Sequence, residues 1–196
     1  MTAAEVLAEV MKDADVYKSS GGGVTISGGE PFSQADFLRE LLTGFKAAGI
    51  HTAVETSAAG RQEDIERCLP LVSMLLCDVK HTDAALLEEW TGAKWGSIRK
   101  NIAAIVSGHP HVLLRIPVIP GFNTDEKSFR GFAAFFREMG ITRVELLPYH
   151  FLGEGKYEML GRPYPGAAID GAQAHAGSLR LAAYLESQGI RAEISG

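Results

Sequence analysis

The sequence predicts an α/β fold in which parallel strands alternate with helices. Three observations predict it: short apolar runs rich in β-branched residues recur along the chain, segments with helical periodicity separate them, and the runs are apolar without a break. An unbroken apolar run is typical of a strand whose two faces are both covered. We therefore expect parallel strands joined by right-handed helical crossovers. Periodicity alone leaves open whether the sheet is open or closes toward a barrel.

The expected strands are short. They comprise Val24–Ile26, Thr52–Val54, Met74–Val79, Val112–Ile119, Arg143–Leu147 and Arg191–Ile194.

The helices are expected from apolar spacing and from signals at their ends. Thr2 with Glu5 has the spacing of a capping box, and Ser33 with Asp36 resembles a second one. Gly49 is expected to end the second helix. The apolar stripes of the later helices contain Ile65 and Leu69; Ile98, Ile102 and Ile105; Phe129, Phe132, Phe136 and Met139; and Leu179, Ala183 and Leu185. The glycine- and proline-rich stretch from Gly153 to Gly171 is expected to be a loop.

Length and composition exclude several classes of protein. The 196 residues are sufficient for one domain, 1–196, with a sizeable core. The net charge of −5, from 24 acidic against 19 basic residues, argues against a nucleic-acid groove. Two cysteines are too few for a zinc ribbon or a disulfide framework. Without a secretory signal or an apolar run of membrane-spanning length, we expect a cytoplasmic protein with free thiols.

Polar residues follow the apolar runs at the strand ends, where parallel α/β folds gather their chemistry. The groups in question are Ser27-Gly-Gly-Glu30, Glu55-Thr56-Ser57, Asp78-Val-Lys80, Arg115 within its strand, and Pro148-Tyr-His150. Five consecutive strands each carry such a group, so we expect a site at this edge.

Taken singly, each group has an alternative structural reading. Gly28 and Gly29 let a ligand approach the bare main chain, or they form a plain turn. Asp78 and Lys80, two residues apart, point to one face of a strand and bind a ligand or pair with each other. Arg115 needs an anion, either a ligand or an acidic residue of the chain.

The remaining polar and aromatic residues favour structural roles. His150 is a ligand contact, a proton carrier or a core histidine. Cys68 and Cys77 are expected to be buried, inert thiols. Trp90, Trp95 and the phenylalanine stripe are expected in the core.

Together the motifs resemble those of one family. Gly21-Gly-Gly-Val-Thr-Ile-Ser-Gly-Gly-Glu-Pro31 is very similar to the glycine motif of radical S-adenosylmethionine (SAM) enzymes. More narrowly, it resembles the activating enzymes of glycyl radical enzymes, the relatives of pyruvate formate-lyase activating enzyme. The other matching segments, in order, are Gly49–Thr56, Asp78–Lys80, Arg115–Gly121 and Leu146–Gly153 with Lys156 and Tyr157. The triple glycine and the Ser-Gly-Gly-Glu-Pro form are closer to activases of the dehydratase, decarboxylase and lyase types.

The resemblance implies a fold and a set of site residues. The fold is a partial parallel (βα) barrel that binds SAM at its C-terminal rim. Gly28, Gly29 and Glu30 match the residues that hold the methionine amino group. Glu55 and Asp78 match acidic positions at the methionyl end, where some members also bind a monovalent cation, and Thr56 is expected beside them.

The other matching residues are also expected at the ligand site. Lys80 and Arg115 line its site, where a cation beside the methionine carboxylate makes physical sense. Asp78, Lys80 and Arg115 are the residues expected closest to the chemistry, and His150 lies near the ribose and adenine end.

The resemblance also implies cofactors and partners. In the family a [4Fe–4S] cluster reduces SAM, and the resulting 5′-deoxyadenosyl radical takes a hydrogen atom from a glycine of a partner enzyme. Flavodoxin or ferredoxin is the expected electron donor. Neither nucleic acid nor a membrane is an expected partner.

The sequence departs from the family at the cluster motif. The family holds its cluster with Cys-x₃-Cys-x₂-Cys upstream of the glycine motif, whereas no cysteine precedes Gly21 here. Two cysteines cannot supply three thiolate ligands, so we expect no cluster on these residues and no activity from this chain alone. The first βα unit is expected to be missing, through a shortened protein, a misplaced gene start or natural loss. The strand Val24–Ile26 would then be an unpaired edge prone to self-association.

Two other functions remain open at this point. One is a remnant that binds SAM or the partner enzyme without catalysis. The other is a Schiff-base lyase on a (βα) barrel with Lys80 as the amine, which leaves the other motifs unexplained.

Overall fold

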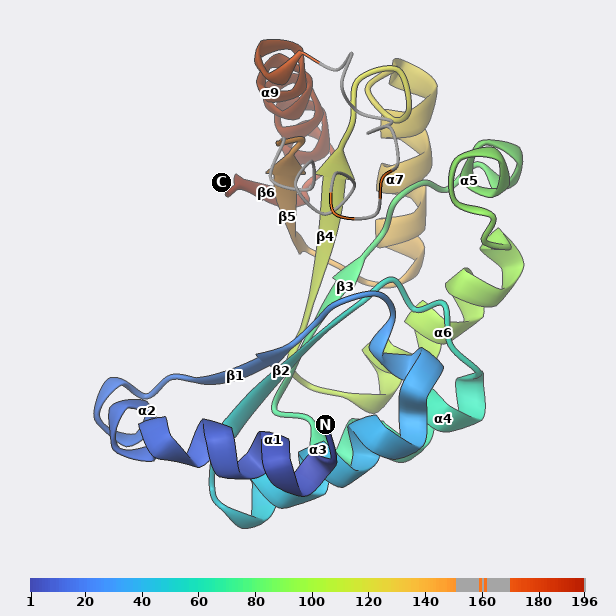
Figure 1. Cartoon of the computed structure of the whole chain (residues 1–196). Helices are drawn as coiled ribbons and strands as arrows, with labels where there is room; N and C mark the ends of the chain where they lie inside the picture. Colours follow the sequence, from blue (N-terminus) through green and yellow to red (C-terminus); the bar gives the residue numbers. More distant parts are fainter. Residues whose placement is uncertain (151–158, 160, 162–169, 196) are drawn as a thin grey trace. The chain divides into compact units, whose positions relative to one another are not determined.

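The chain forms an α/β fold in the computed structural model, with six strands among the residues that it describes (Figure 1). The structure describes residues 1–150, 159, 161 and 170–195. The strand order along the sheet follows the order along the chain, β1-β2-β3-β4-β5-β6. The strands are β1 (Gly23–Ile26), β2 (His51–Thr56), β3 (Met74–Asp78), β4 (Val112–Val118), β5 (Arg143–Pro148) and β6 (Arg191–Ile194). All the predicted strands are confirmed: β6 has the predicted bounds, and the other strands differ from the prediction by one or two residues at an end.

Helices separate the strands, as predicted. The α-helices are α1 (Ala3–Val10), α2 (Ala14–Ser20), α3 (Ala35–Ala47), α4 (Gln62–Cys68), α5 (Ala84–Thr91), α6 (Trp95–Gly108), α7 (Glu126–Glu138) and α9 (Gly171–Ser187). Short 3₁₀ helices in the described part of the chain are η1 (Met11–Asp13), η2 (Pro31–Gln34) and η3 (Leu69–Leu71). The Thr2–Glu5 capping box is present, and Gly49 follows α3 with φ of +68°.

Three details of the helices differ from the prediction. Ser33 does not cap α3, because its hydroxyl donates to the Glu30 carbonyl, and Gln34 occupies the cap position. In α9, Leu185 of the predicted stripe is buried, but Leu179 is 53% exposed, and the helix buries Leu181, which was not in the stripe. Trp90 is 47% exposed and lies outside the core.

The chain forms two compact units. Unit 1 comprises Met1–Asp78 and Gly92–Leu113, and unit 2 comprises Val79–Thr91 and Leu114–Gly196. The prediction of one domain stays a prediction.

Unit 1 contains β1, β2 and β3 with the helices that cover them. β1 pairs with β2 and β2 with β3, both in parallel register. Helix α3 contacts β2 and α4, and α4 contacts α6 (Figure 1). Helix α1 lies along α3, and an added Cβ at Gly44 would lie 2.4 Å from Leu7 Cδ1, which shows how closely the two helices approach. The largest fully buried side chains of the unit are Leu38, Leu42, Phe45, Ile65, Leu75, Ile102 and Ile105.

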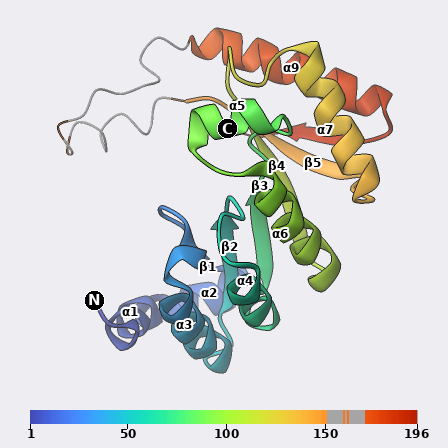
Figure 2. The same ribbon diagram turned by 90° about the vertical axis from the view of Figure 1, so that its right-hand side faces the viewer.

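Unit 2 contains most of β4 with β5 and β6. β4 pairs with β5 and β5 with β6, again in parallel. Helices α7 and α9 lie side by side, and α9 contacts β5 and β6 (Figure 2). Phe132 and Phe136 of the predicted stripe are fully buried.

Burial alternates along the strands, and this differs from the sequence-based picture of two covered faces. In β2, Val54 is fully buried, whereas the neighbouring Ala53 and Glu55 are only partly buried. In β4, Leu114 and Ile116 are buried and Arg115 is partly exposed. Successive side chains of a strand point to opposite faces, so each unit has one fully covered face and one more open face. The open face carries the polar residues of interest.

Candidate functional site

The loop after β1 exposes bare main chain. Gly28 has a φ of +123°, a conformation that L side chains rarely adopt. A Cβ built at Gly28 or Gly29 would meet no atom within 4 Å. Both glycines are exposed, so their peptide groups are accessible to a ligand.

Glu30 fixes this loop through its side chain. Its Oε1 accepts the Thr56 hydroxyl at 2.7 Å and the Phe32 N–H at 3.2 Å. Its Oε2 accepts the Ser57 N–H at 2.9 Å and the Ser57 hydroxyl at 2.7 Å. Because four donors of the chain already surround the carboxylate, its evident role is to join the β1 loop to the end of β2.

Glu55 lies on the opposite face of β2 from Thr56. Its Oε2 accepts a hydrogen bond from the Ser27 hydroxyl at 2.5 Å. Glu55 is in register with Leu76 of β3, and Asp78 lies two residues beyond Leu76 on the same face. The open face of unit 1 therefore presents two carboxylates and the loop Ser27–Gly29. Thr56, buried against Glu30, serves the loop rather than this face.

A buried asparagine supports the loop after β2. Asn101 of α6 donates to the carbonyls of Ala58 and Gly60, each at 2.8 Å. Ala58 has a φ of +57°, and its N–H donates to the Thr56 hydroxyl at 2.8 Å. These bonds hold the loop in a conformation that alanine rarely adopts.

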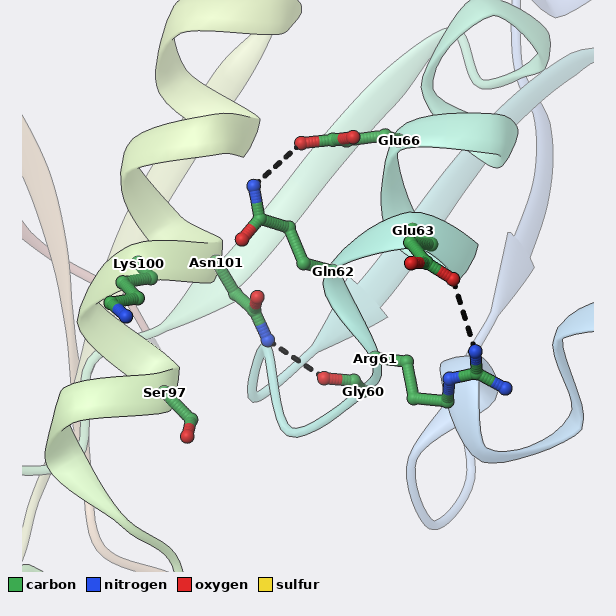
Figure 3. Close-up of a pocket in the computed structure, with 8 residues that line it drawn as sticks. All are labelled: Gly60, Arg61, Gln62, Glu63, Glu66, Ser97, Lys100 and Asn101. Carbon is green, nitrogen blue, oxygen red and sulfur yellow. Dashed lines mark hydrogen bonds and ion pairs between the residues drawn. The ribbon is translucent and has the colours of Figure 1, made fainter.

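A pocket lies beside this loop, between α4 and α6. Its volume is about 570 Å³. Figure 3 shows the lining residues, with Asn101 donating to Gly60: Gly60, Arg61, Gln62, Glu63, Glu66, Ser97, Lys100 and Asn101. None of the sequence-predicted site residues lines this pocket.

Unit 2 holds Lys80 and Arg115. The Val79 N–H donates to the Arg115 carbonyl at 2.8 Å, so the segment carrying Lys80 runs beside β4. Arg115 is in register with Glu145 of β5, and Glu145 with Glu193 of β6. Paired residues on neighbouring parallel strands share a face, so two carboxylates lie on the face of Arg115. The prediction missed both, although the alternation Arg143-Val-Glu145 signals a polar face.

Of the predicted residues at and after the end of β5, the structure describes His150. His150 is exposed at the end of β5, where the preceding Tyr149 N–H donates to the Val118 carbonyl at 3.1 Å. Lys156, Tyr157 and most of the predicted loop Gly153–Gly171 lie outside the described residues.

His81 directly follows Lys80 and was also missed. It is 2% exposed and packs against Phe122, with ring centroids 4.9 Å apart. The Asp83 N–H donates to His81 Nδ1 at 2.8 Å, and Nε2 lies 3.1 Å from the Ser128 hydroxyl. An accepting Nδ1 places the proton of a neutral ring on Nε2, which then donates to Ser128. Burial lowers the pKa of the His81 imidazole, which favours this neutral form.

Asp83 anchors the start of α5 beside His81. Its Oδ1 accepts the Ala85 and Leu86 N–H groups at 3.0 and 3.2 Å, and its Oδ2 accepts from Lys127 at 2.7 Å. The hydrogen bond from Lys127 and those from the main chain lower the pKa of Asp83 to about 2. These hydrogen bonds therefore fix the path of the chain between Lys80 and α5.

The comparisons with known proteins agree with these motifs. Residues 1–133 match the family model of the Radical SAM superfamily, which is more than half of the chain. This chain belongs to the radical SAM superfamily.

The similar proteins within the superfamily are activating enzymes. The chain is 43% identical over 166 residues to the isethionate sulfite-lyase activating enzyme of Nitratidesulfovibrio vulgaris, covering 84% of this chain and 54% of that protein. It is 34% identical over 201 aligned positions to the benzylsuccinate synthase activating enzyme of Thauera aromatica, covering 100% of this chain and 60% of that protein. The chain thus spans less than two thirds of either relative.

A solved structure supports the fold. A domain of the pyruvate-formate lyase-activating enzyme from Bacteroides vulgatus ATCC 8482 matches with a TM-score of 0.70 and 28% sequence identity. The match covers 89% of this chain and 99% of that domain. The predicted partial barrel of radical SAM type is thereby confirmed.

Radical SAM membership implies SAM and a [4Fe–4S] cluster, and these residues fit the two differently. The exposed main chain at Gly28 and Gly29 and the carboxylates of Glu55 and Asp78 suit the ammonium of an amino acid. The only two cysteines, Cys68 and Cys77, are both buried, and burial raises the pKa of the Cys68 thiol. Among the described residues no cluster of three His, Cys, Asp or Glu side chains is arranged to hold a metal ion. Residues 1–196 therefore do not fit the iron–sulfur cluster, because such clusters are held by several Cys thiolates.

Among the described residues, no helix combines the length and the apolar character needed to cross a lipid bilayer.

Proposed function

We propose that this chain is the SAM-binding part of an activating enzyme for a glycyl radical enzyme. The observation that carries the proposal is the Ser27–Glu30 loop, whose bare glycines face open space while Glu30 is bonded to the end of β2. The similarity to activating enzymes of lyases and synthases supports this function.

In this proposal unit 1 binds the methionine end of SAM. The carbonyls of Gly28 and Gly29 accept from the ammonium group, and Glu55 and Asp78 provide negative charge beside it. A monovalent cation at Glu55 and Asp78 would suit the same carboxylates. A rigid loop matters, because the binding atoms are then held in place before the ligand arrives.

Lys80, Arg115 and His150 are proposed to supply further contacts to SAM. Cationic Lys80 and Arg115 suit the methionine carboxylate, and Arg115 offers planar, bidentate donors for it. His150 is proposed to contact the ribose and adenine end. SAM, when bound in a complete enzyme of this family, supplies the 5′-deoxyadenosyl radical.

The proposed partner is a glycyl radical enzyme with a chemistry like that of pyruvate formate-lyase or the lyases named above. Flavodoxin or ferredoxin is the proposed electron donor, and the proposed location is the cytoplasm. The activity requires cluster ligands that residues 1–196 do not supply.

Equilibrium dialysis with radiolabelled SAM tests the proposal through Gly29→Val. The φ of Gly29 is not positive, so valine is tolerated by the main chain but fills the open space where the ligand would lie. We expect the wild-type chain to retain SAM and the variant to lose affinity by about tenfold or more, a loss of at least about 1.4 kcal/mol of binding free energy.

The matched control is Gly96→Val in α6, where an added Cβ also meets no atom within 4 Å. It should retain SAM like the wild type. Equal binding by Gly29→Val and wild type, or no retention by wild type, would overturn the proposed function.

A further inference from the structure

A buried asparagine joins the two segments of unit 2 that carry Lys80 and Arg115. Asn123 is 0% exposed and lies in the turn between β4 and α7. Its Oδ1 accepts the Ile119 N–H at 2.8 Å. Its Nδ2 donates to the Pro117 carbonyl at 2.7 Å and to the Lys80 carbonyl at 3.0 Å. Both amide hydrogens of the side chain are therefore used, one on each segment.

The sequence of β4 explains why a side chain is needed here. The Val79 N–H donates to the Arg115 carbonyl, as in a parallel ladder. The next donor of such a ladder would be the main-chain N–H of residue 117, and Pro117 has none. The Val79 carbonyl therefore receives no ladder bond from residue 117, and the Asn123 side chain links Lys80 to β4.

The turn that presents Asn123 is itself well fixed. The N–H groups of Phe122 and Asn123 both donate to the Ile119 carbonyl, at 3.1 and 3.2 Å. Gly121 has a φ of +79°, which permits this tight turn. Phe122 is buried and stacks on the exposed Trp90, with ring centroids 4.6 Å apart. Trp90 is therefore a probe located beside the turn.

We propose that Asn123 is a positioning residue for the SAM site, holding the Lys80 segment at a fixed place beside the end of β4. This rests on the proposed function. Asn123 is too deeply buried to touch a ligand itself, so it acts through Lys80 and through the main chain of β4. Without its two donated bonds, only the neighbouring residues would hold the two segments in place. Lys80 could then occupy a wider range of positions.

The first test compares Asn123→Ala with Ser178→Ala, both made with Trp95→Phe so that Trp90 is the only tryptophan. Ser178 is equally buried in unit 2, but its hydroxyl donates to the Ala174 carbonyl within the same helix, α9, at 3.0 Å. We expect Asn123→Ala to bind SAM about tenfold or more weakly, the size typical of losing a supporting shell of hydrogen bonds. Its Trp90 emission should change without ligand. Ser178→Ala should match the parent in both SAM affinity and Trp90 emission.

A second variant, Asn123→Asp, separates positioning from a general loss of stability. A carboxylate facing the carbonyls of Lys80 and Pro117 repels them, whereas a protonated acid regains one donor. We expect weak SAM binding at about pH 8 and partial recovery at about pH 5.5, because burial raises the pKa of a carboxyl group. The parent protein is measured at both pH values, because His81 packs against Phe122 and Asp125 lies nearby along the chain.

The outcomes distinguish this inference from the proposed function. SAM binding by Asn123→Ala equal to the parent, or no recovery of Asn123→Asp on acidification, would overturn the positioning role. If the parent itself retains no SAM, the proposed function fails. The link between Lys80 and β4 is then judged by Trp90 alone: emission of Asn123→Asp that returns toward the parent on acidification supports it, and unchanged emission contradicts it.

Discussion

At the scale of single residues, His81 is held as a neutral ring by its neighbours. The Asp83 N–H points at Nδ1, so a proton added there would meet another donor. Burial lowers its pKa, and the nearby carboxylate of Asp83 only partly opposes that effect. The unfolded chain binds the proton more readily than the folded chain, so folding is favoured when the ring is neutral.

This residue predicts a pH dependence of stability. A lowered pKa in the folded state contributes stability that is complete above the ordinary value of about 6.5 and is lost as the pH falls toward the lowered value. We expect the free energy of unfolding in urea to fall between about pH 7.5 and pH 5.5. The variant His81→Asn retains an acceptor for the Asp83 N–H without titrating, and should show a flatter profile.

The control for this experiment is His175→Asn, which changes an exposed histidine of α9. Its profile should follow the wild type. The pKa values of Asp83 and Asp125 are also lowered, but their effect falls below about pH 4 and leaves the measured range undisturbed. An identical slope in wild type and His81→Asn would contradict this account.

The sequence could predict only those site residues that have a local signal. Gly28, Gly29 and Glu55 follow apolar runs directly, so their place at the strand ends was predictable. The role of Glu30 as the link to Thr56 and Ser57 was not, because it depends on contacts between residues more than twenty positions apart. Asn123 lies in a turn, where asparagine is common, and Asn101 lies inside a helix; at neither position does the local sequence signal long-range bonding.

At the scale of elements, β1 lies at one end of the strand order. Among the described strands it pairs only with β2. Val24 and Ile26 are partly buried against the core of α1 and α3, whereas Gly23 and Thr25 are exposed. The strand contains neither a proline nor a charged residue, the two features that commonly protect an edge.

The edge predicts concentration-dependent self-association of this chain. Its free main-chain groups can pair with another strand, and Thr25→Lys should oppose that pairing by adding charge at an exposed position. Sedimentation velocity over a wide concentration range should show association for wild type and a shift toward monomer for Thr25→Lys. Exposed Thr43→Lys in α3 is the matched control. A monodisperse wild-type monomer at high concentration would contradict the predicted self-association through the edge of β1.

The elements themselves were largely predictable because their signals are local. The strands were identified by β-branched apolar runs, and the helices by apolar spacing and by Gly49 and the Thr2–Glu5 capping box. Helix α5 was not predicted, because it is only eight residues long and buries Leu87 alone, so it shows no repeated stripe of core residues, and Trp90 lies on its exposed side. The face that α9 buries was assigned only in part: Leu185 is buried as predicted, whereas Leu179 and Ala183 are exposed, since a weakly amphipathic helix leaves more than one stripe possible.

At the scale of the whole molecule, the chain carries the glycine motif and lacks the thiolates that its superfamily uses. Its two buried cysteines lie in α4 and β3, and burial stabilises the protonated thiol of Cys68 against metal binding. SAM recognition by the loop, the carboxylates and the cationic residues is therefore proposed to be separable from the cluster. That separation is the central claim of the proposed function.

Calorimetric titration of SAM before and after anaerobic reconstitution with iron and sulfide tests this claim most directly. The account predicts binding of one SAM per chain in both preparations, with the same affinity, and iron far below the four atoms per chain that a [4Fe–4S] cluster requires. Four iron atoms per chain, with SAM bound only after reconstitution, would contradict it.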